Sequence, residues 1–465
     1  MANLVSEAER KRRTAELTRA FELLEDVVDL RMADELWPAA PQAVLTTSVV
    51  LWLLVLQRMQ PDLTLETAIK ALLQTRPALG SARRQARQQK LSDNSGAYSR
   101  ARGRLDVAAA QWLAEEVAKS LMDRAEFSFA GRPVFLIDGT TITLAPEPSL
   151  RRKFPPARNQ HGAGVWPVVQ LVVCHELGSG AALIPEVGAM YGPEAISETA
   201  LISEHLSRLP AEAIVLADAG YGIFSVAWQV AQSGRDFLIR LSAQRGNALR
   251  RKATLVSQTA TTKTYRARWY PQGREQKRHG YPPQAALDVW LHQIVIHETL
   301  TLELVTTRPE TAAELAQLYG RRGEVETDLR NLKVVLQLEV SRVRSVEMFR
   351  KELLASIVAY NLVAQFRQQA AALAQLPAKR LSFKRVWSGF RIFLLQSRHA
   401  EPDDWQAAYD RALYHASREK LPNRPGRSYP RQTYSRRPKA HHTQTRRPPQ
   451  PSQCKCHWAL AAGNT

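Results

Sequence analysis

Apolar residues recur at helical spacing through most of the first 125 residues. This pattern predicts a helical N-terminal domain over residues 1–125, with helices at 6–30, 41–58, 63–73, 95–105 and 106–124. Ser6 is a candidate cap for the first helix, and Pro41 is a candidate first residue for the second. A basic stretch at 83–90 links the third helix to the fourth.

The pattern becomes strand-like after Arg132. Residues 133–144 are almost continuously apolar before Asp138 and alternate after it, which is typical of a largely buried strand. A second strand ends at Asp218, where the chain breaks into glycines. Further strands are predicted at 165–177, 181–190 and 236–242, with helices at 192–209 and 224–234.

The interval of about 242–306 is longer than one crossover connection needs and contains two strand patterns around a charged turn at 273–283. We therefore expect a β-rich insertion there. The order of strands and helices predicts a mixed α/β fold, in which helices flank a mixed sheet. The predicted domains are a core at 130–375 containing this insertion, a helical region at 376–416 and a disordered basic tail at 417–465.

Residues 318–339 contain strong helix formers and apolar residues at helical spacing, so one helix is predicted there. On a helical wheel, one phenol, one carboxylate and three cations share a narrow stripe. These residues are Tyr319, Arg322, Glu326, Arg330 and Lys333. Glu324 and Asp328 fall on the opposite side. The alternative interpretation is a solvated face with weak ion pairs.

The chain has 465 residues and a net charge of +20, which favours a polyanionic partner, with nucleic acid ahead of an anionic membrane. Residues 417–465 hold 11 Lys and Arg and one acid, and so carry half of that charge. Non-specific phosphate binding is the simplest role for this tail. Zinc binding by Cys454, Cys456 and His457 is disfavoured because a second ligand pair is missing.

Three cysteines cannot form a disulfide framework, which suits a reducing cytosol. The N-terminal segment lacks the apolar core of a signal peptide, and the longest apolar run, residues 49–56, is too short to span a bilayer. We therefore expect a cytoplasmic protein without membrane association.

The spacing of Tyr319, Arg322, Glu326 and Lys333 matches the YREK signature, so the chain resembles the insertion-sequence-four family of bacterial DDE transposases. The resemblance extends from about residue 28 to about residue 370. One departure is Gly323, where the family usually has tryptophan. Glycine inside a helix costs about 1 kcal/mol relative to alanine, so packing at this point must differ.

The resemblance implies a ribonuclease-H-like catalytic core with a β-rich insertion, and an N-terminal domain that binds transposon ends. It implies that Asp138, Asp218 and Glu326 are the catalytic residues and hold two Mg²⁺ or Mn²⁺ ions. Carboxylate oxygens suit these hard cations, and two ions stabilise both the attacking and the leaving oxygen at a phosphodiester. The implied DNA contacts are Tyr319, Arg322, Arg330, Lys333, Arg100 and Arg104.

Several of these residues have structural alternatives. Asp138 and Asp218 precede or lie near glycine, and the alternative role for both is that of a turn residue. The arginines at 83–104 would alternatively be solvated on a helical cap. Trp269 and Tyr270 are candidates for base stacking, although a core role is the stronger interpretation. His161 and His175, which flank the predicted catalytic strands, are interpreted as structural.

The predicted function is therefore transposition of an insertion sequence, by hydrolysis at the element ends and attack of the exposed 3′-hydroxyl on target DNA. Synapsis of two ends implies a dimer on double-stranded DNA, and hence association with the nucleoid. The alternatives are a ribonuclease-H-like nuclease that cuts without joining, and a domesticated DNA-binding relative that has lost catalysis.

Overall fold

The computed structural model describes residues 28–40, 43–60, 63–75, 95–125, 129–160, 162–298, 300–335, 343–396 and 402–422. All the elements below belong to one compact unit, Met1–Lys420. The stretch at 83–90, His161, most of the tail and most of the predicted helix at 6–30 lie outside the described residues. The cluster of Cys454, Cys456 and His457 lies outside them as well.

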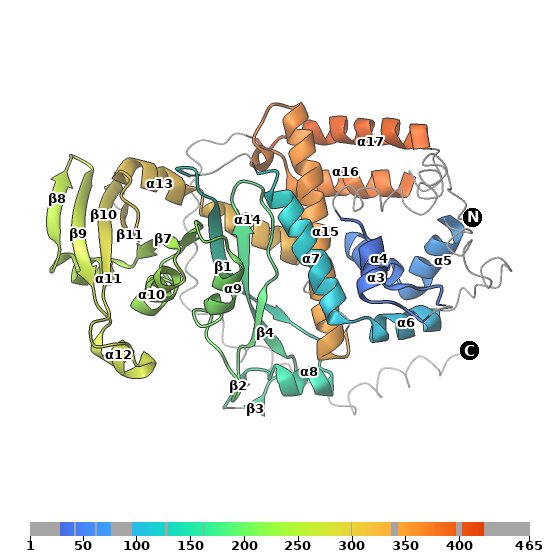
Figure 1. Ribbon diagram of the computed structural model, residues 1–465, viewed down its shortest axis with the longest axis horizontal. Helices are drawn as coiled ribbons and strands as arrows, with labels where there is room; N and C mark the ends of the chain where they lie inside the picture. The colour runs from blue at the N-terminus through green and yellow to red at the C-terminus, as the bar shows by residue number, and fades with distance from the viewer. Residues whose placement is uncertain are drawn as a thin grey trace, which may run out of the picture. The chain divides into compact units, whose positions relative to one another are not determined.

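A nine-stranded mixed sheet forms the centre of the fold (Figure 1), which confirms the predicted mixed α/β class. Its order is β5 (Glu186–Ala189), β4 (Val168–Glu176), β1 (Val134–Thr143), β6 (Ile214–Ala217), β7 (Asp236–Leu241), β11 (Leu300–Thr306), β10 (Leu287–His297), β9 (Thr262–Trp269) and β8 (Thr254–Gln258). Strands β1, β6 and β7 are parallel, and the remaining pairs are antiparallel. A separate hairpin joins β2 (Arg158–Asn159) to β3 (Gly162–Ala163).

The β-rich segment between β7 and α13 (Ala312–Gly320) continues the central sheet instead of forming a separate one. Strand β11 pairs with β7 over four residues, and β10, β9 and β8 follow outward (Figure 1). The predicted charged turn at 273–283 is wrong in part, because residues Gly273–His279 form the short helix α12. Helix α11 (Ala243–Arg250) precedes β8.

The two faces of the sheet contribute to different hydrophobic cores, because side chains alternate along a strand. Val134 and Leu136 of β1 belong to the core shared with the N-terminal and C-terminal helices. Phe135 and Ile137 belong to the other core, which lies beneath α9 (Ile202–Arg208) and α10 (Phe224–Gln232).

Helix α15 (Val346–Leu373) is buried along almost its whole length and contacts helices that precede and helices that follow the sheet in the chain. It lies beside α7 (Val107–Met122) in Figure 1 and also packs against α4 (Thr47–Met59) and α17 (Pro402–Ser417). The other helices are α3 (Arg31–Leu36), α4 (Thr47–Met59), α5 (Leu65–Thr75), α6 (Ser95–Arg104), α8 (Pro148–Lys153), α16 (Phe383–Gln396), α17 (Pro402–Ser417) and the 3-10 turn η3 (Ala378–Arg380). Helix α4 begins at Thr47 and not near Pro41, because Thr46 is still extended.

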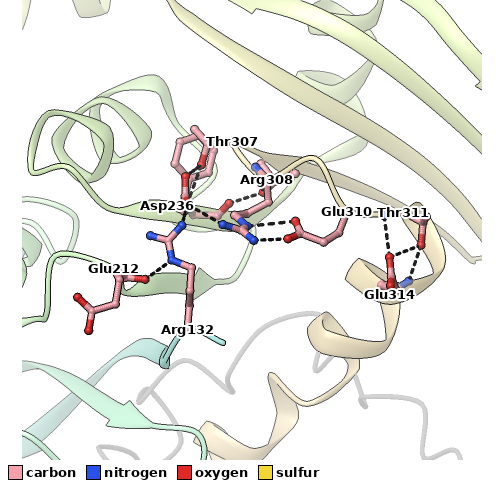
Figure 2. A network of polar contacts seen from close by, with 10 residues as sticks. Arg132, Glu212, Asp236, Thr307, Arg308, Glu310, Thr311 and Glu314 are labelled. Carbon is pink, nitrogen blue, oxygen red and sulfur yellow. Dashed lines mark hydrogen bonds and ion pairs between the residues drawn. The ribbon is translucent and has the colours of Figure 1, made fainter. Parts of the chain in front are cut away.

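A polar network ties the start of β1 to the start of β7 and the end of β11 (Figure 2). Arg132 and Arg308 both form ion pairs with Asp236, and Thr307 donates a 2.6 Å hydrogen bond to the same carboxylate. Burial raises the pKa of Asp236, but its partners outweigh burial and lower the pKa overall. This network fixes the strands at the end opposite to the one where Asp138 and Asp218 lie.

Candidate active site

Asp138 lies inside β1 and pairs in register with Val173 of β4, so the turn alternative for Asp138 is wrong. Its side chain is only 18% exposed. The adjacent Gly139 amide donates a 2.9 Å hydrogen bond to its Oδ1 atom. Strand β6 pairs with β1 only as far as Leu136, which leaves the edge of β1 open beside Asp138.

Asp218 is the first residue after β6, at that open edge. The Gly220 amide donates a 2.7 Å hydrogen bond to its Oδ1 atom, so Asp218 also stabilises the turn that the sequence suggested. Its Oδ2 atom remains directed at the site. The parallel pairing of β1 and β6 brings the two aspartates together, although 80 residues separate them in the sequence.

Glu326 lies on α14 (Gly323–Arg330), and Arg322 immediately precedes that helix. The Arg322 guanidinium contacts all three predicted carboxylates. Nη2 lies 3.5 Å from Oδ2 of Asp138 and 3.5 Å from Oδ2 of Asp218, and Nη1 lies 2.9 Å from Oε1 of Glu326. The two aspartate oxygens are therefore at most 7.0 Å apart, since both lie 3.5 Å from one nitrogen.

Burial and ion pairing have opposite outcomes at Asp138 and Arg322. Burial raises the pKa of Asp138 to about 6, although Arg322 and the Gly139 amide oppose it, and the charges of Asp218 and Glu198 add to the rise. Burial would lower the pKa of Arg322, but its acidic neighbours outweigh burial and raise it. The three acids thus keep the Arg322 guanidinium charged, and its positive charge neutralises part of theirs.

The prediction of one unbroken helix over residues 318–339 is wrong. Helix α13 ends at Gly320, α14 starts at Gly323, and residues Asn331–Val335 form a π-helix, η1. The two glycines explain the first break, because glycine is a poor residue for a helix interior. The predicted stripe is therefore distributed over three elements, although Arg322 and Glu326 still contact each other.

The remaining residues of the stripe have different environments. Tyr319 is buried at the end of α13, and burial raises its pKa to about 12 despite the nearby cations Arg322 and Arg240. Arg330 is exposed on α14, and Lys333 is half-buried on η1.

The side of α14 that carries Glu324 and Asp328, which the wheel placed opposite the stripe, anchors the helix to the protein. Asp328 is 1% exposed and forms an ion pair with Lys379 of η3. Glu324 pairs with Arg321 at 2.8 Å and lies 3.9 Å from Lys379. Burial would raise the pKa of Asp328, but nearby cations lower it overall. These contacts hold α14, the helix that carries Glu326, against η3.

Of the predicted DNA contacts in the N-terminal domain, Arg100 and Arg104 are exposed on α6. Arg102, between them, is buried and donates a 2.6 Å hydrogen bond to Glu352 of α15. Helix α6 thus uses one arginine for packing and leaves the two predicted contacts accessible.

A cavity of about 840 Å³ lies between α10, α11, β9 and α12. Exposed cations line it, namely Arg251, Lys252, Arg268, Arg274 and Arg278. Trp269 packs edge-on against Phe224 at 5.8 Å, which supports its core role, whereas Tyr270 is exposed at the cavity wall. His175 is buried in β4, and burial lowers its pKa to about 4, as suits a structural histidine.

The predicted helix over 192–209 is confirmed only in part, because only Ile202–Arg208 is helical. Gly192 has a φ of +91°, and residues 192–201 form an irregular loop. That loop places Glu198 beside the site, a carboxylate that the sequence reasoning missed. No motif indicated it, since a residue on a predicted surface helix gave no reason to face β1.

The donor set fits hard divalent cations, because carboxylate oxygens surround a buried positive charge. Among the described residues, however, no three acids, histidines or cysteines already stand in metal-binding geometry. Arg322 occupies the space between the three carboxylates, so holding a metal requires the guanidinium to move.

A comparison with family models matches residues 129–362, half of the chain, to the transposase DDE domain. A comparison with curated proteins finds no match. In the described part of the chain, no helix is long and apolar enough to cross a membrane. The matched range contains Asp138, Asp218 and Glu326 together with the strands and helices that bring them to Arg322. The chain belongs to the family of transposases with a DDE domain.

Proposed function

We propose that this protein transposes an insertion sequence of the insertion-sequence-four type, and that Asp138, Asp218 and Glu326 are its catalytic residues. The observation that carries the proposal is their convergence on the guanidinium of Arg322. Three acids from β1, from the end of β6 and from α14 have no packing reason to share one cation. A site for phosphodiester chemistry explains their meeting, and the family match is independent support.

The same proposal includes a ribonuclease-H-like core over 130–375. The supporting features are the three antiparallel strands β5, β4 and β1, the parallel additions β6 and β7, and the late helix α14 across the open edge of β1. Residues 1–125 are proposed as the domain that binds element ends, 376–416 as a helical support and 417–465 as a basic tail.

Asp138, Asp218 and Glu326 would hold Mg²⁺ or Mn²⁺, which when bound neutralises the scissile phosphate and activates the attacking hydroxyl. Arg322, which now pairs with these carboxylates, would then be free to bind a DNA phosphate as a bidentate donor. The buried pair of Asp328 and Lys379 keeps α14 in place during this exchange.

The proposed DNA surface combines the stripe with the N-terminal arginines. Lys333 and the exposed Arg330 would contact phosphates near the cleaved end, and Tyr319 would position that end by packing or hydrogen bonding. Arg100 and Arg104 would contact the element end at a distance from the site. The exposed cations around the 840 Å³ cavity supply a further polyanion-binding surface. A dimer would hold two such ends in synapsis.

The decisive experiment pairs a cleavage assay on uncut element ends with a strand-transfer assay on pre-cut ends, using the inverted repeats that the proposal expects to flank the reading frame. The wild-type protein should join these ends to target DNA in Mg²⁺ or Mn²⁺. Glu326→Gln should bind the ends but neither cut nor join them, while Arg322→Ala and Lys333→Ala should weaken complex formation. Glu115→Gln, on the exposed face of α7, is the matched control and should retain activity.

The possible results separate the candidates. Cutting without joining would identify a nuclease, and binding without either step would identify a domesticated DNA-binding relative. Joining by Glu326→Gln at the wild-type rate would contradict the assignment of the third carboxylate.

A further inference from the structure

An exposed tryptophan and a basic segment follow the strand that carries Asp138. Residues 148–166, which we call the hairpin segment, contain α8 and the β2–β3 hairpin and hold four Lys and Arg and no acid. The last of these residues is Trp166, which is 56% exposed, although tryptophan is highly buried on average in folded proteins. Val168, two positions later, pairs with Thr143 at the end of β1. The hairpin segment therefore makes up most of the connection between β1 and β4.

The backbone on both sides of Trp166 is anchored, so the exposure of its ring does not come from a loose loop. The Arg151 guanidinium of α8 donates a 3.0 Å hydrogen bond to the carbonyl oxygen of Val165. On the other side, the Leu144 amide donates a 3.0 Å hydrogen bond to the carbonyl oxygen of Pro167. Within the described ranges, the Trp166 ring has no aromatic or cationic partner. A fixed, exposed indole is a side chain that suits an interface.

The hairpin segment also carries positive charge without matching acids. Lys153 pairs with Glu194 at 2.8 Å, and Arg151 is engaged by the backbone. Arg152 and Arg158 are exposed, and no acid in the described part of the chain lies within ion-pair distance of either. Exposed cations without acidic neighbours favour a polyanion as the partner of this surface.

The first turns of α15 join the hairpin segment to α6. Phe349 packs edge-on against Phe154 of the segment, with ring centroids 5.8 Å apart. Two positions later, Lys351 donates hydrogen bonds of 3.1 Å to the carbonyl oxygens of Arg102 and Gly103 in α6. Because one helical turn rises only about 5.4 Å, α15 holds the two elements close together. Figure 1 shows α6 and α8 at the same end of α15.

We propose that the hairpin segment and α6 form one surface for the double-stranded DNA of the element end. On this surface, Arg152 and Arg158 contact phosphates, and the Trp166 ring packs against sugars and bases. The inference rests on the proposed function, because it takes the element end as the DNA that α6 binds. Charge selects DNA over a second copy of this chain, since a protein with a net charge of +20 is repelled by the same cations.

The test measures the affinity of the full-length protein for a pre-cut element-end duplex by fluorescence anisotropy at several salt concentrations. Trp166→Ala should weaken binding by about tenfold without changing the salt slope, since it removes an aromatic contact and no charge. Trp166→Phe should recover most of this loss, because it restores a ring. Arg152→Ala and Arg158→Ala should each lower the salt slope by about 0.9, which corresponds to one lost phosphate contact.

The matched controls are Arg411→Ala and Tyr414→Ala, which remove an exposed cation and an exposed aromatic ring from α17. Helix α17 contacts the other end of α15, where Tyr409 donates a hydrogen bond to Gln369, about 30 Å beyond Phe349 along the helix. Both controls should bind the element end as the wild type does. All the replaced side chains are exposed, so each variant should keep the unfolding temperature of the wild type, which a thermal melt verifies.

The outcomes distinguish this inference from the proposed function. If the wild type binds the element end no better than unrelated DNA, the proposed function fails, and this inference fails with it. If the wild type binds and joins the ends while Trp166→Ala and Arg152→Ala bind them equally well, only the inferred surface is overturned.

Two further results would also overturn it. Unchanged binding of the element end by Trp166→Ala, combined with weaker joining, would assign the surface to target DNA. Unchanged binding of the element end, combined with weaker self-association of the free protein in analytical ultracentrifugation, would assign the surface to a contact between two copies of the chain.

Discussion

Replacing Asp138 by asparagine should stabilise the metal-free protein at neutral pH while abolishing its chemistry. Burial raises the pKa of Asp138 from 3.8 to about 6, and that pKa already includes the attraction of Arg322. A difference of about two pKa units corresponds to about 3 kcal/mol. The ionised carboxylate therefore destabilises the folded state at pH 7.5 by about this amount, and the neutral amide of Asp138→Asn removes the penalty.

The pH dependence of this gain has a definite sign. The folded carboxyl group keeps its proton up to about pH 6, whereas the unfolded one releases it near pH 4. The folded state thus binds more protons in this window, and the wild type loses stability as the pH rises through it. The advantage of Asp138→Asn should fall from about 3 kcal/mol at pH 7.5 to about 1.5 kcal/mol at pH 5.

Urea denaturation in EDTA, followed by tryptophan fluorescence at both pH values, measures the free energy of unfolding of each protein. Glu194→Gln is the control and should show no measurable change, because Glu194 is exposed. If Asp138→Asn is less stable than the wild type at pH 7.5, the ion pair with Arg322 outweighs burial, and the reasoning is refuted. A stability gain that does not narrow on acidification would refute it equally.

Three further predictions concern Lys379, Arg322 and the exposed arginines of α6. Lys379→Met should lower the free energy of unfolding by about 3–5 kcal/mol in urea denaturation, because it leaves the buried Asp328 unpaired, and adding Asp328→Asn should recover much of the loss. The Arg322→Gln variant should bind Mn²⁺ about tenfold more tightly than the wild type in calorimetry without DNA. The reason is that a charge-assisted hydrogen bond worth about 1.5–3 kcal/mol no longer competes with the metal for the carboxylates. Weaker binding would mean that Arg322 shapes the site. Arg100→Ala and Arg104→Ala should each reduce affinity for element ends and lower the salt dependence of binding by about 0.9 per lost phosphate contact, and an unchanged salt slope would show that α6 does not contact DNA.

The strands that carry the aspartates were predictable from the sequence because local hydrophobic patterning determines them. Continuous apolar residues before Asp138 and before Asp218 indicate buried strands. Their adjacency was not predictable from the pattern, because it depends on the parallel pairing of β1 and β6 over three residues. The family resemblance supplied that information in place of physical reasoning.

The helix around Glu326 shows where a wheel fails. The wheel assumes one straight α-helix, but the glycines at 320 and 323 divide it, and the π-helix at Asn331–Val335 changes the angle per residue. Arg322 and Glu326 keep their relation because only four residues separate them. Glu198 was missed because its loop was predicted as a helix. The turn at Gly192 packs closely against Pro155, a tertiary contact that the local pattern does not show.

The continuity of the sheet through β7 and β11 has a consequence for how this architecture can change. A separately folded insertion could be deleted and leave the core intact. Here, deletion of residues between β7 and α13 would expose the backbone N–H and C=O groups of β7 as a bare edge, ready to pair with another molecule. The outer four strands therefore protect the catalytic domain from self-association, and a shortened homologue would need a helix or charged residues to cover that edge.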